Sequence, residues 1–177
     1  VLGRVSVRKK GLLGSLSANK PSLRIALAAY QPELRVFGSK TLLLHNSRQD
    51  PSFTHQCMAY SAFASAGLPA PRCGFARVAV NGHDLGHYVL VESIKKPFLK
   101  RAFGDDRGAL YEGSGGADFR ADQLAAFEDE SDAKDAGSGV LQQLSEVLSE
   151  PASEAQQQRL EQLVDLVGQF AGPVLGV

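Results

Sequence analysis

An Asn81-Gly82 pair lies between two stretches in which apolar and polar residues alternate, and it limits the folds open to this chain. Asn-Gly favours a tight two-residue turn, because both residues adopt positive φ angles with little strain. The flanking residues, 75–80 and 88–91, have the two-residue period of strands with one buried face. The sequence therefore predicts an antiparallel hairpin in the middle of the chain.

Further strands and a helix are predicted before this hairpin. Alternating or apolar runs at residues 5–8, 22–27 and 41–44 indicate three strands, and glycines mark a loop between the first two. Asp50 and Pro51 are typical of a helix start, as cap and first helical residue, and Gly67 is typical of its end. Apolar residues recur between them at three- and four-residue steps, so one face of this helix is expected to pack on a sheet.

The remainder of the chain is predicted to be mainly helical. A short helix at residues 97–103 and a strand at 109–113 precede two amphipathic helices at 140–149 and 154–170. This order predicts an α+β fold with an antiparallel sheet and helices to one side. We expect a first region at residues 1–126, an acidic mobile loop at 127–139 and a helical segment at 140–177.

Composition excludes some classes of function. The 177 residues suit one domain, and 19 basic against 19 acidic side chains leave no basic excess for nucleic acid binding. No apolar run of about 18 residues is present, so no membrane span is expected. The two cysteines, Cys57 and Cys73, fit either a disulfide in a secreted protein or two buried thiols.

The first candidate for chemistry is a glycine-bearing loop with a lysine behind it. Gly11, Gly14 and Ser15 could let backbone amides approach phosphate oxygens, and Lys20 could project from a strand to neutralise their charge. The spacing matches neither the Walker loop nor the dinucleotide-binding fingerprint. A plain hairpin turn and a solvated lysine are the alternative interpretation.

Other polar residues give weaker signals. Glu92 ends an apolar strand, where it would either line the rim of a cleft or pair in solvent with Lys95 or Lys96. The four histidines lack the close spacing of zinc ligands, and no serine lies in a Gly-x-Ser-x-Gly elbow. The sequence therefore predicts no metal site of its own and no hydrolase triad.

Several short motifs nevertheless follow one another in the order of a known family. The chain opens with arginine, glycine and lysine-serine motifs, Val7-Arg8-Lys9-Lys10-Gly11, Gly14-Ser15 and Lys20-Pro21-Ser22. Further motifs follow at residues 46–52, 58–60, 66–72, 80–82, 86–88, 91–92, 98–104 and 110–113. This ordered set resembles the kinase-like domain of spore coat protein H, the CotH family, over about residues 5 to 120.

The resemblance implies an atypical protein-kinase-like small lobe and the start of a helical second lobe. Members of the family bind ATP with Mg²⁺ and phosphorylate proteins, notably of the spore coat, and many relatives are secreted or on the cell surface. By resemblance, the nucleotide-binding residues are Arg8, Gly11, Gly14, Ser15, Lys20 and Glu92. Lys20 would contact the phosphates, the glycine loop would cover the nucleotide, and Glu92 would lie at the edge of the cleft.

The chain departs from the family towards its end. Family members continue past residues 163–166 into aspartate motifs that resemble a catalytic base and a magnesium ligand, whereas here the sequence runs into Gly172-Pro173. We therefore expect no catalytic aspartate within this chain, and little activity from the chain alone. The alternative is a non-catalytic surface module, a pseudokinase. The protein substrate is not indicated by the sequence.

Overall fold

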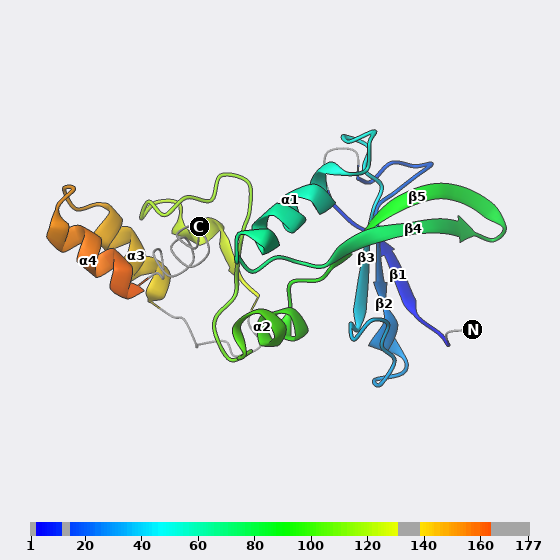
Figure 1. The fold of residues 1–177 in the computed structure, drawn as a ribbon, viewed down its shortest axis with the longest axis horizontal. Helices are drawn as coiled ribbons and strands as arrows, with labels where there is room; N and C mark the ends of the chain where they lie inside the picture. The colour runs from blue at the N-terminus through cyan, green and yellow to red at the C-terminus, as the bar shows by residue number, and fades with distance from the viewer. Residues whose placement is uncertain (1–2, 12–14, 131–138, 164–177) are drawn as a thin grey trace. The chain divides into compact units, whose positions relative to one another are not determined.

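The computed structural model of the chain describes residues 3–11, 15–130 and 139–163. They belong to two compact units, residues 1–104 and 105–177. The first unit contains a sheet and two helices, and the second contains a small hairpin and two helices (Figure 1). The α+β class is thus confirmed.

The sheet of the first unit has five antiparallel strands in the order β1-β2-β3-β5-β4. They are β1 (Ser6–Lys9), β2 (Leu23–Ala26), β3 (Thr41–His45), β4 (Cys73–Val80) and β5 (His83–Glu92). A 3₁₀ turn, η1 (Leu27–Ala29), follows β2. The helix α1 (His55–Ser65) connects β3 to β4, and α2 (Lys96–Phe103) follows β5. Three inner strands, β2, β3 and β5, are therefore paired on both edges.

The predicted hairpin joins β4 to β5. Asn81 and Gly82 have φ angles of 52° and 78°, as a two-residue turn of this kind requires. The paired strands continue well beyond the ends of the other three, as Figure 1 shows. The opposite end of β5 pairs with β3, from Leu42 against Glu92 to His45 against Val89. The Asn-Gly turn therefore sets the register of a strand that lies inside the sheet.

The register separates the side chains of the sheet onto two faces. Leu23, Leu44 and Leu90 lie directly opposite one another across three strands, and with Tyr88 they belong to the apolar core; we call this side the apolar face. The neighbouring row, from Arg24 through Leu43 and Val91 to Cys73, points to the other side. We call that side the helix face, because Cys73 is covalently bonded to α1 there.

The helix α1 begins later than the sequence suggested. Residues 51–53 form a turn with Phe53 at φ 62°, and Thr54 rather than Asp50 occupies the cap position. The Asp50 carboxylate still accepts the His55 backbone N–H at 3.0 Å, so it orders the helix start from outside the helix. The expected apolar face is not buried either, because no residue of α1 is buried. Side-chain packing therefore contributes little to holding this helix on the sheet.

The second unit contains β6 (Tyr111–Gly113) paired with β7 (Phe127–Asp129), and the helices α3 (Val140–Leu148) and α4 (Glu154–Leu163). A 3₁₀ turn, η2 (Leu124–Ala126), precedes β7. The start of the predicted acidic loop is thus a strand, because residues 127–129 pair with β6. Residues 131–138, and the predicted helical residues beyond 163, lie outside the described part. None of the described helices has the length and apolar character needed to span a membrane.

Candidate functional site

Gly11, the first glycine of the predicted loop, lies close to Ser15. Gly11 has a φ angle of 92°, and a β-carbon placed on it would lie 2.6 Å from the Ser15 β-carbon. The Ser22 backbone N–H donates to the Ser15 carbonyl at 2.6 Å, which holds Ser15 next to the start of β2. Only glycine fits at position 11 without strain. Gly14 lies outside the described residues.

A polar cavity of about 220 Å³ lies beside Ser15. It is lined by Ser15 from the loop, Ser22 before β2, His45 and Asn46 at the end of β3, and Asp50 before α1, among others. Asn46 is buried, and its backbone N–H donates to the Ser22 hydroxyl at 3.0 Å. The cavity is therefore built where the ends of two strands meet the start of a helix.

His45 in this cavity is a neutral histidine. Burial and the nearby charge of Lys10 lower its pKa from 6.5 to about 4, although a hydrogen bond with Gln56 acts in the opposite direction. Lys10 Nζ lies 3.1 Å from His45 Nε2. Because an ammonium group can only donate, His45 Nε2 is the acceptor of this bond. The Lys10 ammonium group thus donates to a neutral imidazole at the cavity.

Asp50 is the carboxylate of the cavity lining. Its pKa is lowered, mainly by the hydrogen bond from the Ser52 hydroxyl and also by backbone N–H groups, and burial only partly opposes this. One oxygen accepts from the Ser52 hydroxyl at 2.5 Å and the other from the His55 N–H at 3.0 Å. Both Asp50 carboxylate oxygens are therefore hydrogen-bonded to residues just before or at the start of α1. Across the described residues no three His, Cys, Asp or Glu side chains group as metal ligands, so no magnesium ligand is assigned.

The two cations predicted from the sequence lie on opposite sides of the sheet. Arg8 lies on β1 directly opposite Arg24 of β2, which places it on the helix face. Lys20 Nζ lies 4.7 Å from the centre of the Phe53 ring and 5.2 Å from that of Tyr88, on the apolar face. The sheet therefore separates Lys20 from Arg8. The nucleotide contact of Lys20 stays a prediction.

Glu92 is held by a different partner from the one suggested by the sequence. Its carboxylate accepts from Arg101 Nη2 at 2.5 Å and from the Arg72 N–H at 2.9 Å. Burial would raise its pKa, but these hydrogen bonds outweigh burial and lower it. Glu92 also lines a cavity of about 640 Å³ with Leu42 and Leu90, distinct from the polar cavity beside Ser15.

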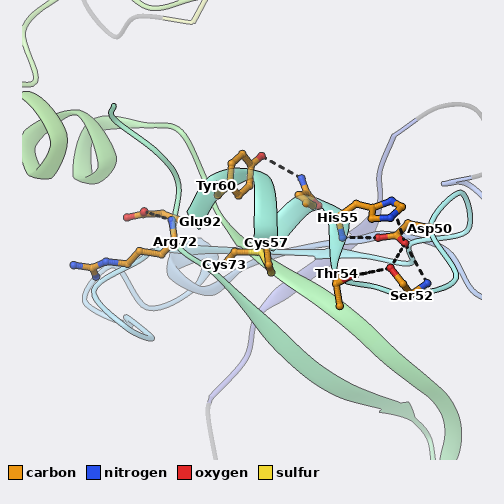
Figure 2. Close-up of a disulfide and its surroundings, with 10 residues drawn as sticks. Asp50, Ser52, Thr54, His55, Cys57, Tyr60, Arg72, Cys73 and Glu92 are labelled. Carbon is orange, nitrogen blue, oxygen red and sulfur yellow. Dashed lines mark hydrogen bonds and ion pairs between the residues drawn. A yellow bond between two sulfur atoms is a disulfide. The ribbon is translucent and has the colours of Figure 1, made fainter. Parts of the chain in front are cut away.

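The two cysteines form a disulfide between α1 and the first residue of β4. Cys57 and Cys73 are bonded, with their α-carbons 5.2 Å apart, as Figure 2 shows. The bond closes the segment that contains α1 and its return to the sheet. Since no α1 side chain is buried, the disulfide is the strongest link of this helix to the sheet.

Sequence reasoning missed three polar residues that belong to this region, Lys10, Arg24 and His45. Pairing residues 6–9 with 23–26 across the loop would have found the first two, because that register puts Arg8 opposite Arg24 and directs Lys10 to the same side. The strand predicted at residues 41–44 stops one residue before His45. His45 is instead the last residue of β3, where its side chain reaches Lys10.

Comparison with known proteins decides the family. The family model described as CotH kinase protein matches residues 7–170. This chain belongs to the CotH family. An inner spore coat protein H-like protein from Bacillus subtilis (strain 168) is 32% identical over 69 residues, which are 39% of this chain and 22% of the relative. The matched part thus spans about a fifth of that relative's length. The CotH resemblance drawn from the ordered motifs is confirmed.

Proposed function

We propose that this chain binds the phosphate groups of ATP as part of a CotH kinase-like domain, and that the intact parent protein phosphorylates Ser or Thr. The substrate would be a spore coat, surface or secreted protein. The observation that carries this proposal is the CotH kinase match over residues 7–170. The coat association comes from the relative in Bacillus subtilis, whose name places it in the inner spore coat.

Gly11 supports a phosphate-binding role. Phosphoryl transfer depends mainly on positioning and on charge stabilisation, and glycine lets a backbone approach phosphate oxygens closely. At Gly11 the need for glycine is steric, since a side chain would collide with Ser15. The polar cavity beside Ser15 is lined by hydroxyl and amide groups, and Lys10 contacts its His45. These groups suit a small, highly charged ligand.

Magnesium would bridge phosphate oxygens and neutralise their charge when bound. The described residues do not supply a fitting set of ligands, since Asp50 is engaged by Ser52 and His55. We therefore assign the binding of phosphate to the described residues and assign no catalytic base among them.

The disulfide supports a compartment outside the reducing cytosol. Disulfides form and persist in oxidising environments, and Cys57–Cys73 links the described elements α1 and β4. We infer that the protein works in the spore coat, at the cell surface or after secretion. Mass spectrometry of the natively produced protein, alkylated before and after reduction, tests this inference. Alkylation of both cysteines without reductant would contradict it.

A binding experiment and an activity experiment test the function at two levels. Saturating Mg-ATP is expected to raise the melting temperature of this chain, because a ligand at about 100 times its Kd stabilises the folded state by about 2.7 kcal/mol. The parent protein is expected to transfer labelled γ-phosphate to a protein acceptor, and this chain is not. Absence of both stabilisation and transfer would refute the proposal. Stabilisation without transfer by the parent would identify a pseudokinase.

A further inference from the structure

Two arginines face each other across the first two strands of the sheet. Arg8 of β1 lies directly opposite Arg24 of β2, so both side chains point to the helix face. Lys10 lies two residues after Arg8, so its side chain points to the same face of the sheet. The strand pairing extends to this residue, because the Lys10 backbone N–H donates to the Ser22 carbonyl at 3.0 Å. Arg8, Lys10 and Arg24 form a group that we call the basic row.

The two arginines of the basic row have no counter-charge in the part of the chain that the structure describes. Among the described residues, no carboxylate lies within 4.0 Å of the Arg8 or Arg24 guanidinium, and neither donates a hydrogen bond. Arg24 is half-buried on an inner strand. Like charges placed opposite each other on neighbouring strands destabilise a sheet, and a half-buried guanidinium without a partner adds to that cost. A bound anion would remove both costs.

The surroundings of the basic row also favour an anion. Lys10 contacts neutral His45, which lines the polar cavity with the Ser15 and Ser22 side chains. Asp50, the carboxylate of this cavity, has its oxygens occupied by neighbouring donors. Cations next to a cavity lined by hydroxyl groups suit phosphate oxygens, which accept several charge-assisted hydrogen bonds at once.

We propose that Arg8, Lys10 and Arg24 together bind the phosphate groups of the ligand on the helix face. Lys20 then serves as a packing residue on the apolar face, where its ammonium group lies against the Phe53 and Tyr88 rings. The identity of the ligand as a nucleotide rests on the proposed function, whereas its phosphate chemistry rests on the basic row. Three cations in a chain of zero net charge fit a small phosphorylated ligand better than a nucleic acid.

The experiment compares three probes, Mg-ATP, inorganic tripolyphosphate and inorganic phosphate, by calorimetric titration and thermal melting of the whole chain. Arg24→Glu is expected to weaken tripolyphosphate and ATP binding by tenfold or more, roughly the effect of one lost charged hydrogen bond. Without ligand, the same variant is expected to melt at the same or a higher temperature, because Glu at position 24 would pair with Arg8. If Arg24 only stabilised the fold, the Arg24→Glu variant would instead melt at a lower temperature than wild type.

Matched controls come from the same region. Lys9→Gln removes one charge from the same strand, but Lys9 lies opposite Leu23 on the apolar face, so binding is expected within about twofold of wild type. Lys20→Met, which keeps an apolar contact with the two rings, tests the competing phosphate contact that the family resemblance gives to Lys20. A tenfold loss in Lys20→Met with no loss in Arg24→Glu would overturn the proposal.

The probes separate this inference from the proposed function. Tripolyphosphate binding that depends on Arg24, without tighter binding of ATP, would support the basic row and refute the nucleotide. ATP binding that is unchanged in Arg24→Glu would support the nucleotide and refute the basic row. Binding of none of the three probes would overturn both.

Discussion

Removing the disulfide is expected to release α1 while leaving most of the sheet intact. Cys57 and Cys73 are 16 residues apart, and closing a loop of this length restricts the unfolded chain by about 3 kcal/mol at 25 °C. The helix has no buried side chain to compensate for the loss. The double variant Cys57→Ser, Cys73→Ser should therefore lose up to about 3 kcal/mol of stability in the first unit.

The location of the loss is the sharper part of this prediction. Amide hydrogen exchange should accelerate strongly within α1, and much less in β3 and β5, whose central residues Leu44, Val89 and Val91 are buried. Met58→Ala, on the exposed side of the same helix, is the control and should leave exchange unchanged. Unchanged α1 protection in the double variant would refute the claim that the disulfide anchors this helix.

Three further predictions concern stability. Because its pKa is depressed, His45 should make the protein about 2 kcal/mol less stable at pH 5 than at pH 7, with stability complete above about pH 6.5 and falling towards pH 4. His45→Gln should flatten this slope in urea titrations, and an unchanged slope would exclude His45 as its source. Gly11→Ala should lose about 1 to 2 kcal/mol in the same assay, through its positive φ and the contact with Ser15, and a neutral effect would contradict that strain. Glu92→Gln should lose about 1 to 3 kcal/mol at pH 7, because Arg101 keeps only a neutral acceptor, and equal stability of the two proteins there would contradict this.

The elements of the first unit could largely be predicted because their signals are local. Asn81-Gly82 determines a turn through its own φ angles, and the alternation on either side needs no distant contact. The order of motifs likewise predicted the CotH family. In the second unit, β7 escaped prediction because residues 127–129 are a strand only through pairing with β6.

The start of α1 and the partner of Glu92 show where local signals fail. Asp50 and Pro51 have the residue types of a helix start, but the turn at Phe53 delays the helix while Asp50 still binds the His55 N–H. Glu92 pairs with Arg101, nine residues away on α2, because that helix turns back towards the end of β5. Neither geometry follows from spacing in the sequence.

The candidate site depended even more on the register of the strands. A shift of one residue in the pairing of β1 with β2 would move Arg8 and Lys10 to the opposite face of the sheet. The sequence grouped Arg8 with Lys20, whereas the register groups it with Arg24. Arg8 and Lys20, which belong to neighbouring motifs, are thus separated by the sheet, whereas Arg8 and Arg24, 16 residues apart, are brought together.

The most direct test of the account is the response of the backbone amide signals of this chain to Mg-ATP in an NMR titration. We predict saturable shifts that begin at Lys10, Gly11 and Arg24 and that require at least tenfold more Mg-ATP in an Arg24→Glu variant. A chain whose amide signals are unaffected by millimolar Mg-ATP would contradict the central claim that it binds the phosphate groups of a nucleotide.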